Sequence, residues 1–232
     1  MNCLKCRESM DSVCPSFDKD SDLKYVVKFL SYRFSINFCS ITFVEKEGYY
    51  SLHIVSDRKL KQSKNYKRIN RTIDDIVVKG WEVILQSNPD CEFYDEFIAE
   101  RNFNVEHFHR SDSVHRGHLL ASQLKGYLVP NGKCEEKNVN DFFGKGCVEN
   151  ISYQTKKANC DSKNHHGQLF FEREILGFLE VNRGSKVYYN IYDISVNERS
   201  LGRVINYYND CSSSSEMLEW IFISNVKVRN AS

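Results

Sequence analysis

The chain has 232 residues, 41% of them hydrophobic, which is ordinary for a globular protein and sufficient for a packed core. Lys and Arg number 32 against 31 Asp and Glu, and this formal net charge of +1 excludes a strong overall attraction for polyanions, so binding to them requires a local basic patch. No apolar run is long enough to cross a membrane, and we therefore expect no membrane partner.

The first 22 residues contain a Cys-x-x-Cys pair. Cys3 and Cys6 are followed by Cys14, a spacing compatible with zinc, although a fourth ligand at a suitable distance is not visible. A disulfide or free thiols explain the same pattern. Because no basic segment followed by an apolar run stands near residue 1, we expect an intracellular protein with reduced thiols; a mature secreted form would have the same features.

Residues 23–103 predict a mixture of helices and strands. Apolar residues at helical spacing predict a helix over 23–30, and residues 92–103 can form another. Alternating residues or apolar runs predict strand or core segments over 34–38, 49–55, 73–78 and 81–85. No low-complexity linker marks a domain boundary. Residues 1–100 are therefore an N-terminal part of uncertain fold, either a separate module or integral to the same domain as residues 101–232.

A run of basic residues lies between these segments, over residues 57–71. Its cations include Lys59, Lys61, Lys64, Lys67 and Arg68. Such a run is usually a solvated face of the protein. The alternative is a patch that follows the phosphates of a nucleic acid.

The residues most suggestive of chemistry are Arg116, Gly117 and His118, in direct succession. A guanidinium can hold two phosphate oxygens, and a glycine lets a ligand approach the backbone. An imidazole can take a proton from water near neutral pH. A basic surface turn would give the same three residues, so the pattern requires support from elsewhere in the chain.

That support comes from two segments downstream. Residues 150–159 read Asn150-Ile-Ser-Tyr-Gln154-Thr155-Lys-Lys-Ala-Asn159, and residues 167–172 read Gly-Gln-Leu-Phe-Phe-Glu172. With Arg116-Gly-His118, this ordered set resembles the non-specific DNA/RNA endonucleases of the ββα-metal type, in the branch of bacterial DNA-entry and streptococcal secreted nucleases. The resemblance covers roughly residues 112–228, and the spacing within 150–159 is its most specific part.

The resemblance implies a role for each of these residues. His118 would be the general base that activates water, and Asn159 would be the direct protein ligand of one Mg²⁺ ion, for which Mn²⁺ can substitute. Glu172 would hydrogen-bond a metal-bound water or orient Asn159. Arg116 would bind phosphate or support the structure. Three of these residues also have an ordinary structural explanation. His118 could be a surface or core histidine, Asn159 a turn asparagine and Glu172 a solvated helical glutamate.

Three further residues complete the candidate site. Asn150 and Gln154 match polar positions that support the site in this family, although hydrogen-bonded buried amides would explain them too. His115 stands where the family usually has Asp. If its side chain lay within about 4–6 Å of His118, a protonated His115 would lower the pKa of His118.

The remaining histidines are less informative. His107 and His109 have strand-like spacing and could reach the cleft of the candidate site around His118. His165 and His166 lie in a polar insertion, where we expect them to be exposed to solvent.

The C-terminal half predicts an α+β fold: a mainly antiparallel sheet with a ββα-metal nuclease core and helices packed on the sheet. Residues 148–153 fit a strand that returns to the Arg-Gly-His strand, and residues 125–149 have loop chemistry. Residues 168–181 predict a helix. Further strands are predicted over 186–193, 202–208 and 219–228.

Two functions follow from these observations. The first is a Mg²⁺-dependent, sequence-non-specific endonuclease that acts on DNA, with RNA as an open alternative. The second is a catalytically weakened relative that binds nucleic acid or protein. His115 in place of the usual Asp and the near-neutral net charge support this alternative. The sequence leaves the preferred nucleic acid and the oligomeric state undetermined.

Overall fold

The computed structural model describes residues 21–35, 41–55, 64–99, 101, 103, 115–144, 146–209 and 217–225. These residues form a seven-stranded antiparallel sheet in the order β1-β2-β9-β8-β7-β4-β3 and a separate two-stranded ladder, β5-β6. The strands of the sheet are β1 (Ile41–Glu45), β2 (Tyr50–Val55), β3 (Tyr66–Ile73), β4 (Ile76–Gln86), β7 (Lys186–Val196), β8 (Arg199–Asn209) and β9 (Met217–Ser224). The strands of the ladder are β5 (His115–His118) and β6 (Ile151–Gln154).

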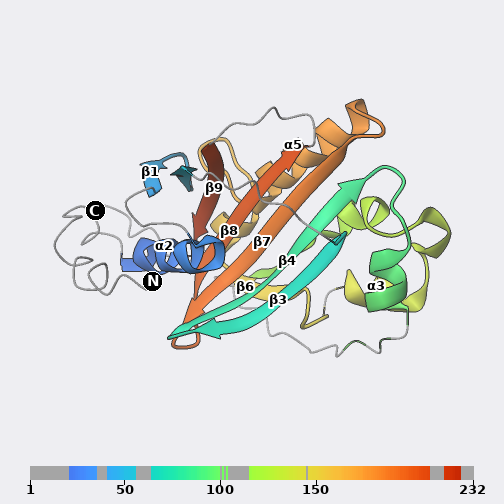
Figure 1. The fold of residues 1–232 in the computed structure, drawn as a ribbon, viewed down its shortest axis with the longest axis horizontal. Helices are drawn as coiled ribbons and strands as arrows, with labels where there is room; N and C mark the ends of the chain where they lie inside the picture. The colour runs from blue at the N-terminus through green and yellow to red at the C-terminus, as the bar shows by residue number, and fades with distance from the viewer. Residues whose placement is uncertain are drawn as a thin grey trace.

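Helices cover both faces of the sheet. The described helices are α2 (Ser21–Phe34), η3 (Tyr94–Ile98), η4 (Ser122–Tyr127), η5 (Asn131–Lys133), α3 (Lys137–Phe142), α4 (Lys156–Asn159) and α5 (Gln168–Val181). In Figure 1, α2 crosses the near face, whereas α5 and the segment around α3 lie behind and beside the sheet. None of the helices in the described ranges is long and apolar enough to cross a membrane.

Strand alternation divides the core into two layers. Along β4, Trp81, Val83 and Leu85 contribute to the core on the α5 side. Ile76 and Val78 of the same strand contribute to the core under α2, together with apolar residues of α2 itself. Because successive side chains of a strand point to opposite faces, one apolar strand supplies both layers.

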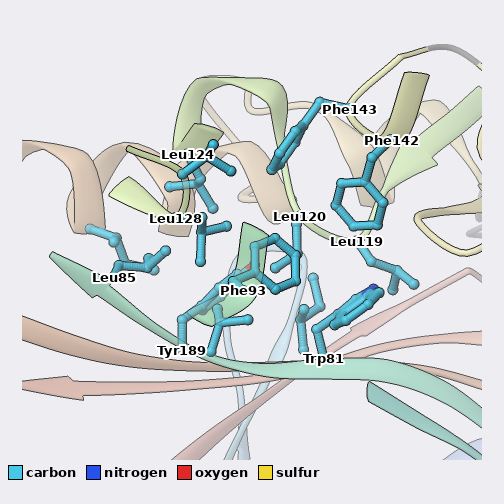
Figure 2. Packing of buried hydrophobic residues seen from close by; sticks show 14 of the residues in the cluster. Trp81, Leu85, Phe93, Leu119, Leu120, Leu124, Leu128, Phe142, Phe143 and Tyr189 are labelled. Carbon is cyan, nitrogen blue, oxygen red and sulfur yellow. The ribbon is translucent and has the colours of Figure 1, made fainter. Parts of the chain in front are cut away.

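The α5 side of the sheet anchors the chain on either side of the candidate site. Leu119 and Leu120 directly follow His118, and both are buried beside Trp81 and Phe142, as Figure 2 shows. The Trp81 ring meets the Phe142 ring edge to face at a centroid distance of 5.5 Å, and its Nε1 donates to the Glu149 carbonyl at 3.2 Å. The sheet therefore fixes both the residues that follow β5 and the residue that precedes Asn150 and β6.

Several sequence predictions are confirmed. The helix over 168–181 is α5, residues 23–30 lie within α2, and strands β2, β7, β8 and β9 fall on or overlap the predicted segments. The α+β fold with a mainly antiparallel sheet is also confirmed.

Other predictions need correction. Phe34 ends α2 instead of opening a strand, and the two apolar runs over 73–85 belong mostly to a single strand, β4. Residues 125–149, predicted as loops, include α3 and short 3-10 helices. Of the helix predicted over 92–103, residues 92–98 are helical, with Tyr94–Ile98 in π-helical form, and the described residues 99, 101 and 103 are not helical. Strand β3 was not predicted because its residues are mostly polar and exposed at the edge of the sheet.

Candidate active site

The ladder β5-β6 positions the Arg-Gly-His segment. His115 lies opposite Gln154, Arg116 opposite Tyr153, Gly117 opposite Ser152 and His118 opposite Ile151. Opposite residues of an antiparallel pair share a face, and faces alternate along each strand. Arg116 and His118 therefore lie on one face of the ladder, and His115 and Gly117 lie on the other.

His118 is fixed through its ring. Its Nε2 lies 3.0 Å from the Gly144 carbonyl oxygen, which can only accept a hydrogen bond, so Nε2 carries the proton of the neutral ring and Nδ1 is left as an acceptor. Burial lowers the pKa of His118 below 6.5, and the positive charges of Arg203 and Arg116 act in the same direction, against the raising effect of the Gly144 hydrogen bond. The imidazole is thus held in its neutral form at neutral pH.

Asn150 braces the backbone around His118. It is fully buried, its Oδ1 accepts from the Leu120 amide at 2.7 Å, and its Nδ2 donates to the Leu120 carbonyl at 2.9 Å and the Phe142 carbonyl at 3.3 Å. Leu120 follows His118 by two residues, and Phe142 precedes Gly144 by two. One amide therefore ties the strand that carries the imidazole to the loop that holds it.

Arg203 of β8 is the main contributor that the sequence analysis missed. It is fully buried, and its Nη2 donates to the Gly117 carbonyl at 2.7 Å and to Ser152 Oγ at 2.9 Å. Its Nη1 donates to the carbonyl oxygen of His118 and to Gln168 Oε1. One guanidinium thereby connects β5, β6, β8 and the start of α5. The sequence signal is weak, because Arg203 is a single cation inside an apolar strand.

Glu172 is buried behind this connection and is not a solvated helical residue. Its Oε1 accepts from Gln168 Nε2 at 2.6 Å, and the same Nε2 donates to the His118 carbonyl at 2.8 Å. Burial raises the pKa of Glu172 to about 7, against the lowering effects of the Gln168 hydrogen bond and the charge of Arg203. Glu172 is therefore linked to the His118 backbone through Gln168.

Gly117 and Gln154 fit together on the inner face of the ladder. A Cβ at Gly117 would collide with Gln154 Oε1 and would stand 3.0 Å from Arg203 Nη2. Glycine is required here for close packing. The Gln154 side chain is buried, and neither Oε1 nor Nε2 has a hydrogen-bond partner among the described residues. Its role in this structure is to fill the space over Gly117.

Asn159 is the last residue of α4, which packs against β5 and against α5. Thr155 caps α4, since its Oγ1 accepts from the Ala158 amide at 3.2 Å. The Asn159 side chain is half-buried and makes no hydrogen bond within the described part of the chain. Gly167 allows α5 to start against the end of α4, because a Cβ there would collide with the Cys160 carbonyl.

The other candidate residues lie away from the imidazole. His115 is on the opposite face of β5 from His118, and the cations that lower the pKa of His118 are Arg203 and Arg116. A direct effect of His115 on His118 is therefore not supported.

His165 and His166 are half-buried, contrary to expectation. The His166 amide donates to the Glu47 carbonyl at 2.8 Å, and its Nδ1 lies 3.1 Å from Asp161 Oδ1. The first contact holds the insertion against the β1-β2 turn, and the second lies within the insertion itself.

The basic run is only partly described. Lys67 and Arg68 are exposed on the edge strand β3, and Lys64 pairs with Glu96 at 3.6 Å. Lys59 and Lys61 lie outside the described residues, as do Cys3, Cys6, Cys14, His107 and His109. In sheet order, β3 is separated by β4 and β7 from β8, whose Arg203 contacts the ladder.

The structure thus joins His118, Asn150, Arg203, Gln168 and Glu172 through one set of contacts. Within the described ranges, no three His, Cys, Asp or Glu side chains gather as a group that could hold a metal ion. A comparison with models of known protein families finds no match to this chain, and a search of curated proteins finds no significant match.

Proposed function

We propose that the protein is a Mg²⁺-dependent, sequence-non-specific endonuclease that hydrolyses phosphodiester bonds of DNA, with β5, β6 and α5 as its ββα-metal core. RNA has the same phosphodiester backbone and is the second substrate to test. The observation that carries this proposal is the His118 imidazole, with Nε2 held by the Gly144 carbonyl and Nδ1 left to accept a proton. Its lowered pKa keeps the ring neutral, which is the form a general base requires.

The side chains around His118 have separate tasks in this proposal. Nδ1 of His118 removes a proton from the water that attacks phosphorus. Arg116, on the same face of β5, binds a phosphate oxygen and offsets its charge. Arg203, Gln168 and Asn150 hold the backbone on which His118 is mounted, and buried Glu172 holds Gln168.

The residues present fit a hard divalent ion with few protein ligands. Mg²⁺ binds oxygen, keeps several of its waters and often uses one or two protein ligands. Asn159 offers an amide oxygen without a hydrogen bond to the described residues, and α4 lies against the strand of His118. Asn159 would hold the ion, which when bound would stabilise negative charge on the phosphate and the leaving oxygen.

A nuclease assay on four proteins tests the proposal. Plasmid nicking should require Mg²⁺ or Mn²⁺ and stop in EDTA. His118→Ala should lose at least about 100-fold of the hydrolysis rate, the lower end of what general-base catalysis contributes. Asn159→Ala should lose activity that excess metal restores only in part. The control is His53→Ala, on β2 of the main sheet, which should cleave like the wild type.

The same assay separates the two candidate functions. A folded wild type that binds DNA without cutting it would favour the alternative, a catalytically weakened binding module. Near wild-type cleavage by a well-folded His118→Ala variant would overturn the assignment of the base.

A further inference from the structure

Next to His118, the outer face of the ladder carries an aromatic side chain that the proposed chemistry does not use. Tyr153 of β6 is 44% exposed and lies directly opposite Arg116. Arg116, in turn, lies near enough to His118 for its charge to lower the pKa of the imidazole. A solvent-accessible ring, a guanidinium and the candidate base therefore share one face of β5-β6.

The segment after Tyr153 carries two further cations close to the ladder. Lys156 and Lys157 are both exposed on α4, which packs against β5. Within the described part of the chain, neither lysine forms an ion pair with a carboxylate. Arg116 thus lies opposite the exposed Tyr153 ring, and the two lysines follow that ring in the chain on a helix that packs against the same ladder.

This combination matches the chemistry of a single nucleic-acid strand. Unpaired bases stack on exposed aromatic rings, and Lys and Arg follow the phosphates between them. A base inside a duplex is already stacked on its neighbours and cannot use the ring without being unpaired.

We infer that Tyr153, Arg116, Lys156 and Lys157 form a binding surface for single-stranded nucleic acid, with Tyr153 as the stacking platform for an unpaired base next to His118. The inference rests on the proposed function and adds a substrate class to it: the enzyme prefers single strands, or unpaired nucleotides, over intact duplex.

Binding measured without catalysis tests this surface independently of the nuclease assignment. A fluorescein-labelled single-stranded DNA oligonucleotide and a labelled duplex of the same sequence are titrated in EDTA over a series of salt concentrations, with fluorescence anisotropy as the readout. The proteins are the wild type, Tyr153→Ala, Tyr153→Phe, the double variant Lys156→Ser/Lys157→Ser, and Tyr32→Ala. Tyr32 is the matched control, since it is 61% exposed on α2, on the other face of the sheet.

Each variant has a distinct expected result. Tyr153→Ala should bind the single strand about tenfold or more weakly with an unchanged salt slope, because stacking is lost and no phosphate contact is lost. Tyr153→Phe and Tyr32→Ala should bind like the wild type. The double lysine variant should flatten the salt dependence by about 0.7 per lost contact on single strands. The effect of Tyr153→Ala on duplex should be much smaller.

Two results would overturn the inference: wild-type affinity of Tyr153→Ala for the single strand, or equal losses on single strand and duplex. A wild type that binds single strands as described but does not cut them in Mg²⁺ would overturn the proposed function and leave the binding surface standing.

Discussion

Arg203 carries a positive charge into the interior, where a cation without partners would be strongly unfavourable. Its hydrogen bonds to the Gly117 and His118 carbonyls offset that cost, together with the nearby carboxyl groups of Asp193 and, once it is ionised, Glu172. Burial raises the pKa of Asp193, and the charge of Arg203 opposes that rise. Arg203 therefore acts on the site in two ways, by holding the β5 backbone and by its charge on the imidazole.

Replacing Arg203 by Gln should raise the pKa of His118, because a positive charge that disfavours imidazolium is removed. A base that must be neutral then loses activity at a higher pH, so the acidic limb of the rate profile moves towards higher pH. NMR titration of the His118 ring and the pH–rate profile measure the two shifts. The variant should also be destabilised by about 3–5 kcal/mol, since buried carboxylates lose their counter-charge.

One further variant separates the effect of Arg203 on the position of His118 from the effect of its charge, and a second variant is the control. Arg203→Lys keeps the charge but loses the forked hydrogen bonds, so it should lower the rate with less change in the acidic limb. Arg33→Gln removes a partly buried cation that pairs with Glu82 under α2, and it should leave the profile of His118 unchanged. If the profile of a folded Arg203→Gln protein superimposes on that of the wild type, Arg203 has only a structural role.

At the scale of elements, α5 contributes a buried carboxyl group whose protonation is coupled to folding. Burial raises the pKa of Glu172 from 4.5 to about 7. Between these values the folded protein keeps a proton that the unfolded chain has released, so the free energy of unfolding falls as pH rises through this window. Above pH 7 the carboxylate has to be charged inside the protein.

Glu172→Gln should remove this penalty while keeping an oxygen for Gln168. Relative to the wild type, the variant should gain on the order of 1–3 kcal/mol more stability at pH 8 than at pH 5. Denaturant unfolding at both pH values measures the difference. Glu180→Gln, at an exposed position of the same helix, is the control and should show no such dependence. An equal effect of Glu172→Gln at both pH values would contradict the assignment.

The basic run over residues 57–71, of which Lys67 and Arg68 lie on the edge strand β3, leads to a separate prediction about duplex binding. Changing Lys59, Lys61, Lys64, Lys67 and Arg68 together to Ser should weaken binding to duplex DNA if these cations contact phosphates. The slope of log affinity against log salt should then fall by about 0.9 for each lost contact. Salt-dependent anisotropy on duplex DNA measures it. An unchanged slope would identify the run as a solvated face.

The elements differ in how far the sequence could predict them. Helix α5 was predictable because its apolar residues repeat at helical spacing, and β7 because Val187, Tyr189 and Ile191 recur at every second position. Strand β3 was not, because an edge strand needs few apolar residues. His118 and Asn150 could be picked out by order and spacing, whereas Arg203 depends on a contact across 85 residues that spacing does not reveal.

On the scale of the whole molecule, the sheet joins the two halves of the chain. Strands β1 to β4 precede residue 100, and β7 to β9 follow residue 185, yet β4 pairs with β7 over its full length from Ile76 to Gln86. Trp81, Val83 and Leu85 of β4 lie in the same core as Leu119 and Phe142, on either side of the imidazole. The support of the candidate site is therefore distributed over both halves.

A fragment of residues 101–232 should consequently fail to fold, although it contains every residue assigned to catalysis. Without β4, β7 would become an apolar edge strand, and the core around Leu119 and Phe142 would lose Trp81, its fully buried partner. Deleting a large buried aromatic alone costs about 3–5 kcal/mol, which is a large share of the stability of a typical domain. Circular dichroism, thermal unfolding and plasmid nicking should show no cooperative transition and no cleavage. A fragment of residues 21–232 keeps every described contact and should melt cooperatively, so it serves as the control. A cooperative, active 101–232 fragment would mean that the ladder and α5 fold without the N-terminal strands, and that the core around Trp81 adds stability without being required for the site.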